Sequence, residues 1–294
     1  MNVTNACFQA DMYGDSEDLL GKYFAANPDK RDKVFLATKF GLRHDVDNPG
    51  INSSPEYCRA SIERSLARLK LPYVDLYYIH RLDGVTPIEK TMEVLVQLKN
   101  EGKIRHIGIS ECSAGSLRRA HAIHPISCVQ VEYSPFVQDI ESPAIDILAT
   151  ARELDVAIVV NSPLARGLFG GAIRSFEDVT KPGDVRVKFG LPWFQEENIE
   201  KNIALVDRIT AIAAEKGVTA AQLVLGWILA QGDDFFAIPG TTKIYRLKEN
   251  LGALEVKVTK EEEQAIRKVA GEVAGGRIPQ QYERHNFADT PALE

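Results

Sequence analysis

The stretch "VDLYYIHRLDGVTPIEKTMEVLVQLKNEGKIRHIGIS" (residues 74–110) contains a strand, a helix and a second strand in succession. Its two ends are apolar and rich in β-branched and aromatic residues, as strands are. Between them apolar residues recur on one helical stripe, and Gly102 ends the pattern: Ile88, Met92, Leu95 and Leu98. Apolar strands joined by a helix predict parallel pairing in a sheet covered by helices.

The same alternation runs along the rest of the chain. Besides 74–80 and 103–110, strands are predicted at 33–40, 128–134, 156–162 and 234–242, with one more just before Tyr13. Helices are predicted at 55–70, 87–102, 113–123, 142–155, 198–216, 219–231, 244–252 and 260–271, the last opened by a capping box from Thr259 to Glu262. Seven strands are one fewer than a closed barrel needs. We therefore expect an α/β fold, a (β/α)8 TIM barrel lacking its first β-α unit, as a single domain over 1–294.

Composition narrows the class of protein. The chain is 45% hydrophobic and 26% charged with a net charge of −6, which is typical of a soluble globular protein and argues against a nucleic-acid surface. Its four cysteines have no C-x-x-C spacing, so we expect reduced thiols and no metal site. No signal peptide is evident, and the apolar runs are too short to span a membrane. A cytoplasmic protein without membrane insertion is expected.

Three titratable side chains fall at successive predicted strand ends: Tyr13, Lys39 and His80. In a parallel barrel the carboxyl ends of the strands carry the active site. A tyrosine is a weak acid near neutral pH, and a nearby lysine is expected to lower its pKa. The histidine could orient a carbonyl oxygen. Alone, each residue has a structural alternative: packing for the tyrosine, an ion pair for the lysine, a loop contact for the histidine.

Reduction of a carbonyl also needs a hydride, which no side chain supplies, so a nicotinamide cofactor is implied. No G-x-G-x-x-G follows a strand, which argues against a Rossmann site. Residues 162–171 and 238–250 offer phosphate sites instead, since Gly240, Thr241 and Thr242 open a helix. Lys243 and Arg246 would suit the extra phosphate of NADP, although a capped helix with a solvated basic face is the alternative.

Taken together, the motifs resemble the aldo-keto reductase family from about Ala10 to the C-terminus. They are "YGDSEDLLGK", "VFLATKFG", "VDLYYIHR", "GKIRHIGISECS", "VQVEYSPF", "SPLARG", "IPGTTK" with "RLKEN", and "FADTP". The resemblance implies a (β/α)8 barrel that reduces an aldehyde or ketone with NADPH. Tyr13 would be the proton donor, Lys39 the residue that lowers its pKa, and His80 the residue that orients the substrate.

The resemblance also implies a set of cofactor-binding residues. Ser110 and Gln130 would hold the nicotinamide carboxamide. Ser162, Leu164 and Gly167 would form the pyrophosphate loop. The adenosine-phosphate clamp would consist of Gly240, Thr242, Lys243, Arg246, Glu249 and Asn250.

The sequence departs from the family pattern at several positions. The family has an aspartate five residues before the tyrosine, and here Phe8 stands there, so activity could be impaired. Asn161 stands where a tyrosine that stacks on the nicotinamide is common, and Trp193 where an arginine is common. Residues 1–9 match nothing in the family, and the first strand and helix are missing, which suggests an alternative start, a splice variant or a wrong gene boundary.

Two other functions stay open from the sequence. One is a non-catalytic relative that binds the cofactor and regulates a membrane channel. The other is a barrel lyase that uses Lys39 as a Schiff base. The substrate and the oligomeric state are not defined by the sequence, beyond a small carbonyl compound as the expected partner.

Overall fold

The computed structural model describes residues 6–43 and 50–293. Part of the unmatched 1–9 segment, residues 1–5, therefore lies outside the described residues. The chain divides into two compact units. The first contains the chain up to Val131, then Pro143–Ile158 and the end from His285; the second contains Glu132–Ser142 and Val159–Arg284. The prediction of one domain over 1–294 is not tested by this division.

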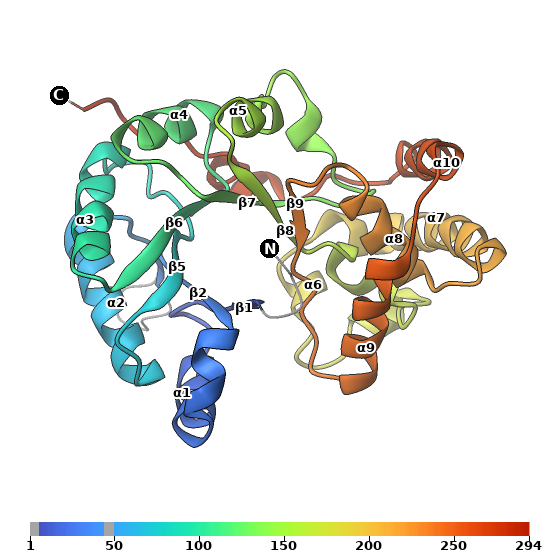
Figure 1. The fold of residues 1–294 in the computed structure, drawn as a ribbon. Coiled ribbons are helices and arrows are strands. Elements are labelled where there is room, and N and C mark those ends of the chain that lie inside the picture. Colours follow the sequence, from blue (N-terminus) through green and yellow to red (C-terminus); the bar gives the residue numbers. More distant parts are fainter. Residues whose placement is uncertain (1–5, 44–49, 294) are drawn as a thin grey trace. The chain divides into compact units, whose positions relative to one another are not determined.

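The first unit is built around parallel strands in the order β1-β2-β5-β6-β7 (Figure 1). These strands are β1 (Ala6–Phe8), β2 (Phe35–Phe40), β5 (Val74–Ile79), β6 (Ile104–Ser110) and β7 (Cys128–Glu132). The pairing register places Lys39 beside Tyr78, and Ser110 beside Gln130. Because all pairs are parallel, the carboxyl ends of these strands lie at one edge.

Successive helices pack against one another outside these strands (Figure 1). They are α1 (Ser16–Ala26), α2 (Pro55–Leu69), α3 (Ile88–Asn100), α4 (Ala114–Ile123) and α5 (Ile147–Glu153). Local chemistry sets their ends. In α2, Pro55 is the first helical residue, Ser54 Oγ accepts from Tyr57 N at 3.3 Å, and Lys70 ends the helix in a left-handed conformation. The predicted helix at 142–155 is too long, because Asp146 has a φ of 55° and the helix starts only after it.

The strand prediction continues into the second unit. β8 (Ala157–Asn161) begins beside β7, where Ala157 N donates to Ser127 O at 3.2 Å. In the second unit, Ile238 N after β9 (Phe235–Ala237) donates to Val160 O at 3.1 Å. All seven strands predicted from the alternating pattern are thus present among the described residues. A further antiparallel pair, β3 (Leu42–Arg43) and β4 (Gly50–Ile51), was not predicted.

The helices of the second unit are α6 (Val185–Lys188), α7 (Glu196–Glu215), α8 (Ala220–Leu229), α9 (Ile244–Gly252) and α10 (Lys260–Ala270). The capping box predicted for α10 is present, with Thr259 Oγ1 accepting from Glu262 N and the Glu262 carboxylate accepting from Thr259 N. Around Trp227 the core is aromatic, with the Tyr133 ring stacked 5.3 Å away. Within the described residues, no single helix is both long and apolar enough to cross a membrane, while α7 and α8 meet that test only as a pair bent by 85°.

Candidate active site

The first unit brings Tyr13, Lys39 and His80 together, as the sequence predicts. Tyr13 lies in the turn after β1, Lys39 is the next-to-last residue of β2, and His80 follows β5. Lys39 Nζ lies 5.1 Å from the centre of the Tyr13 ring. The Tyr13 and His80 rings meet edge to face at 6.0 Å. His80 is fixed through its backbone, because its N–H donates to Phe40 O at 2.7 Å.

Lys39 is a buried cation held by a backbone carbonyl. Its side chain is almost fully enclosed, and Nζ donates to Gln9 O at 2.8 Å. Burial, and then the positive charge of Arg81, lower the pKa of Lys39 to about 8, while Cys7 and Asp11 oppose the change. The neighbouring Phe8 packs against Tyr78 at 6.3 Å between ring centres. The acceptor of this ammonium is thus a neutral backbone carbonyl.

Tyr13 differs from the expectation in its acidity. The residue is 44% exposed, yet the surrounding protein removes enough water from the hydroxyl to raise the pKa of Tyr13 above its usual value. Only Arg81 acts in the opposite direction. The net shift is therefore upward, opposite to the predicted lowering. The physical reason is that desolvation outweighs charge here, and Lys39 Nζ points to Gln9 O.

The surroundings of His80 favour its neutral form. Burial, followed by the charges of Lys39 and Arg81, holds the pKa of His80 well below its usual range. A neutral imidazole carries one N–H and one acceptor nitrogen. His80 Nδ1 is buried and has no hydrogen-bond partner among residues 6–43 and 50–293. A buried ring atom left unpaired in this way suits a site that a bound ligand completes.

Arg81 is a residue of this site that the sequence reasoning missed. One of its guanidinium nitrogens, Nη1, donates to His80 O at 2.9 Å and to Ser110 Oγ at 3.1 Å. It also affects the pKa of all three titratable side chains. Its position directly after the histidine, at the same strand end, was the available signal.

The two residues expected to hold a nicotinamide carboxamide are neighbours on paired strands. Ser110 ends β6 and Gln130 lies in β7, and both are buried. The next residue, Glu111, has a left-handed backbone with a φ of 53°, and its N–H donates to Gln130 O at 2.9 Å. A serine hydroxyl and an amide side by side can bind the donor and acceptor of a carboxamide.

The second unit contains a cavity of about 570 Å³ at the predicted phosphate loops. Six of the predicted residues line it: Ser162, Leu164, Gly167, Gly240, Arg246 and Asn250. The other three, Thr242, Lys243 and Glu249, are not among its lining residues. Thr242 and Lys243 are exposed. The cavity therefore brings together two predicted loops, but only part of the predicted clamp.

The backbone of the first of these loops is unusual. Ser162, Ala165 and Arg166 have φ values of 48°, 48° and 54°, and Gly167 has 98°. Side chains other than glycine rarely adopt this region, and such strain concentrates at binding sites. Within this loop Ala165 N donates to Ser162 O and Gly167 N donates to Leu164 O, each at 3.0 Å.

The charges around the cavity are mostly paired. Three lining cations have carboxylate partners: Arg166 with Glu132 at 2.8 Å, Lys181 with Asp178 at 2.9 Å, and Arg186 with Asp184 at 2.9 Å. Arg246 instead donates to Gly170 O at 3.0 Å and has no carboxylate partner in the part of the chain described here. It is therefore the lining cation best placed to accept a further anion.

Of the remaining departures from the expected pattern, Trp193 contributes to the core of the second unit. Trp193 is buried, packs against Phe136 at 6.0 Å, and accepts a hydrogen bond from Asn202 on its carbonyl. Asn161 ends β8 and is partly exposed. In residues 6–43 and 50–293 the four cysteines are free thiols, and no cluster of three metal-binding side chains occurs.

Comparison with known proteins identifies relatives over nearly the whole chain. The aldo/keto reductase family model matches residues 8–270. The chain is 46% identical over 270 residues to aldo-keto reductase str7 of Strobilurus tenacellus, covering 91% of this chain and 78% of that protein. It is 43% identical over 290 residues to a Schizosaccharomyces pombe aldo-keto reductase named for NADP(+), covering 97% and 84%.

A comparison with solved structures supports the same family assignment. The fold resembles that of a glycerol dehydrogenase from Gluconobacter oxydans with a TM-score of 0.79 and 28% identity, covering 99% of this chain and 84% of that one. The predicted family and barrel class are thereby confirmed, and the NADP(+) relative supports the cofactor prediction. The chain belongs to the aldo-keto reductase family and has its α/β barrel fold.

Proposed function

We propose that this member of an oxidoreductase family reduces an aldehyde or ketone to an alcohol with NADPH. The observation that carries the proposal is the cluster of Tyr13, Lys39 and His80, whose rings and ammonium lie about 5 to 6 Å apart. The cofactor would supply the hydride to the carbonyl carbon. Side chains of the protein would bind the substrate and supply the proton.

His80 would bind the carbonyl oxygen. Because its imidazole is neutral, it can donate one hydrogen bond without carrying a competing positive charge. Its edge-to-face contact with the Tyr13 ring would place that oxygen near the phenol. Tyr13 would then transfer the phenolic proton to the oxygen as negative charge develops there. Lys39, beside the tyrosine ring, would stabilise the phenolate that remains.

Ser110 and Gln130 would hold the carboxamide of the nicotinamide. The second-unit cavity would hold the phosphates, with the left-handed loop at Ser162–Gly167 forming part of its wall. Arg246 would bind the 2′-phosphate that distinguishes NADP from NAD, because it is the lining cation without a carboxylate partner in the described residues.

The test is oxidation of NADPH in the presence of a panel of aldehydes and ketones. Wild-type protein should consume NADPH with at least one carbonyl compound. Tyr13→Phe should lose about 10²–10⁴-fold of that rate, the usual contribution of a general acid, while cofactor affinity stays close to wild type. The matched control is Tyr23→Phe on α1, which removes an exposed hydroxyl. A Tyr13→Phe variant that keeps most of its turnover would place the chemistry elsewhere.

One observation favours a second candidate, a cofactor-binding relative with little or no turnover. Lys39 has the Gln9 carbonyl as its hydrogen-bond acceptor, and Phe8 occupies the position of the family aspartate. The same assay separates the two functions. Tight NADPH binding without consumption across the whole panel would favour the second.

A further inference from the structure

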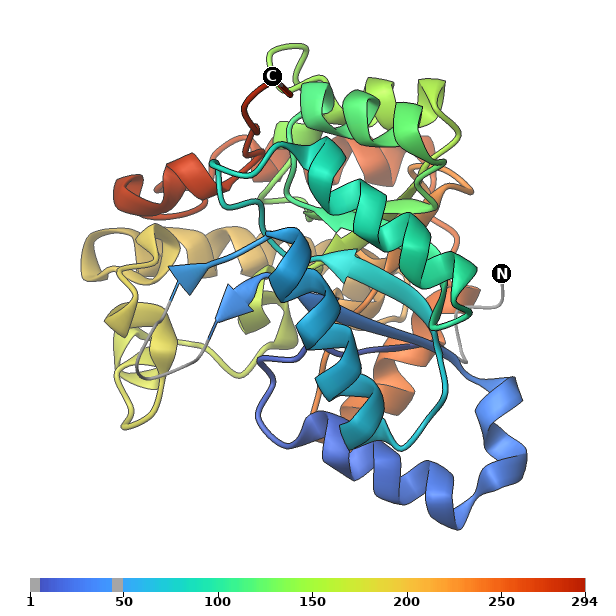
Figure 2. The same ribbon diagram turned by 90° about the vertical axis from the view of Figure 1, so that its left-hand side faces the viewer.

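The C-terminal segment, residues 287–291, lies against the turn between β6 and α4 (Figure 2). Ala288 N donates to Glu111 O at 2.9 Å, and Ser113 N donates to Ala288 O at 2.9 Å. The two bonds enclose Cys112, which forms a parallel bridge with Ala288. The end of the chain thus extends the hydrogen bonding of β6 just beyond Ser110.

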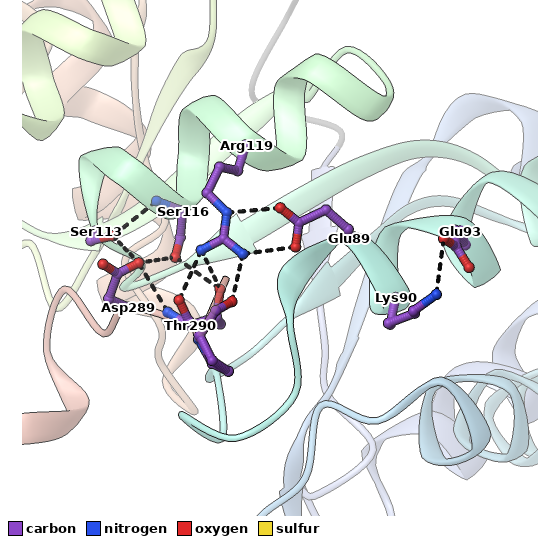
Figure 3. Close-up of polar contacts among 9 residues, drawn as sticks. Glu89, Lys90, Glu93, Ser113, Ser116, Arg119, Asp289 and Thr290 are labelled. Atoms are coloured by element: carbon purple, nitrogen blue, oxygen red, sulfur yellow. Dashed lines mark hydrogen bonds and ion pairs between the residues drawn. The ribbon is translucent and has the colours of Figure 1, made fainter. Parts of the chain in front are cut away.

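Asp289 fastens the segment to the start of α4 (Figure 3). Its Oδ1 accepts from Ser116 Oγ at 2.6 Å and from Ser113 Oγ at 3.0 Å. Ser113 is also the N-cap of α4, accepting from Ser116 N at 2.9 Å. A carboxylate at a helix N-terminus is stabilised by the helix dipole.

Arg119 provides the second attachment (Figure 3). Its guanidinium donates to Thr290 O at 2.8 Å and to Pro291 O at 2.6 Å. It is oriented by a bidentate contact with Glu89 at 2.7 and 2.8 Å, at the start of α3. Such planar, two-pronged pairing fixes the direction of the arginine as well as its position.

The turn that this segment touches is strained and functionally placed. Glu111 is buried with a φ of 53°, a conformation that is costly unless surrounding bonds enforce it. Its N–H is bonded on one side to Gln130 O, and its carbonyl on the other side to Ala288 N. Ser110 directly precedes it. Removing the bond to Ala288 should allow the turn to relax and carry Ser110 with it.

We propose that residues 287–291 are a positioning segment for the β6–α4 turn, and that Asp289 is a positioning residue for binding of the nicotinamide end of the cofactor. This inference rests on the proposed function, because Ser110 is assigned there to the nicotinamide carboxamide. It predicts an effect shared by NADPH and NADH, which have the same nicotinamide. A change at Arg246 should instead discriminate between them.

The experiment measures dissociation constants for both nucleotides and amide hydrogen exchange over residues 108–116. Asp289→Ala should weaken binding of NADPH and NADH alike, by about tenfold, the scale of one hydrogen bond to a charged group. Exchange of the Ser113 amide, which is bonded to Ala288 O, should accelerate at least about tenfold, since local opening then needs less free energy. Asp289→Asn keeps an acceptor oxygen and should restore most of both properties.

The matched control is Glu153→Ala. Like Asp289→Ala, it removes a carboxylate that bonds to a side chain of α4, since Glu153 pairs with Arg118 at 2.6 Å, but Glu153 does not contact residues 287–291. It should leave both nucleotide affinities and the exchange of residues 108–116 unchanged. If Asp289→Ala does not fold, Arg119→Lys, which loses the planar fork, takes its place.

Two results would overturn the inference. One is unchanged exchange at Ser113 in a folded Asp289→Ala protein, which would show that the segment does not hold the turn. The other is faster exchange with both nucleotide affinities within about twofold of wild type, below the scale of a single hydrogen bond. A wild-type protein that binds neither nucleotide would instead refute the proposed function, and the exchange comparison would still decide whether the segment holds the turn.

Discussion

Replacing Arg81 with glutamine should move the alkaline limit of the reaction upward. Arg81 is the second cause, after burial, of the low pKa of Lys39, which is about 8. Repulsion between two like charges near a protein surface, at an effective dielectric of about 20, is on the order of a few kcal/mol. Partial exposure of Arg81 reduces this to about 1 kcal/mol, a little under one pKa unit. The pKa of Lys39 should therefore rise toward about 9.

The consequence for rate follows from the role of the ammonium. In the proposed mechanism Lys39 stabilises the Tyr13 phenolate in its charged form, so kcat/KM should fall as pH rises through the pKa of Lys39. In Arg81→Gln this fall should occur at a pH higher by about one unit. Loss of the hydrogen bond from Arg81 to Ser110 should lower kcat/KM at every pH without changing the pH at which it falls.

Two measurements check this result. The first is the pH dependence of kcat/KM, and the second is an NMR titration of lysine labelled with ¹³C at Cε, which reads Lys39 without needing activity. Arg59→Gln is the control, because Arg59 lies on α2 and forms a partly exposed ion pair with Glu101, just after α3. The role assigned to Arg81 would be refuted if, in Arg81→Gln, kcat/KM still fell at a pH of about 8 or lower and the NMR titration still gave Lys39 a pKa of about 8 or lower.

Three further outcomes are expected. Arg246→Ala should weaken NADPH binding by about 1–3 kcal/mol and leave NADH binding nearly unchanged, whereas Lys243→Ala, outside the cavity, should have the smaller effect in the same titrations. Burial raises the pKa of Asp11 to about 6, so its folded carboxyl costs stability as pH rises from about 4 to 6. Asp11→Asn should therefore raise the free energy of unfolding by about 1 kcal/mol at pH 7.5 but not at pH 4 in denaturant titrations, and equal gains at both would contradict the assignment. Phe8→Asp should raise the pKa of Lys39 by about 1–3 units, which NMR would detect, and no rise would mean that position 8 does not face the lysine.

Sequence reasoning worked best where local chemistry decides the outcome. The helix at α9 matches its predicted bounds, and α10 starts at its predicted capping box. The convergence of Tyr13, Lys39 and His80 followed from parallel strand ends, because register alone places them at one edge.

Reasoning from the sequence failed where a property depends on the three-dimensional surroundings of a residue. The acidity of Tyr13 is set by how much water the fold removes, which no spacing encodes. Lys243 is only three residues from Arg246, yet only Arg246 lines the cavity. The left-handed backbone at Ala165 and Arg166 was not predictable either, because neither residue type favours it.

The attachment of the C-terminal segment also has a consequence for the order of events during synthesis. The Asp289–Ser116 bond joins residues 173 positions apart, and the first unit is interrupted in sequence by the second. Contacts of such separation form late, after a large cost in chain entropy. On a ribosome, α4 and Ser110 emerge long before Asp289 exists. The turn that carries Ser110 should therefore acquire this restraint only after residues 287–291 have been made, so a chain that stops before them would contain every proposed catalytic side chain but lack the contact proposed to hold the turn.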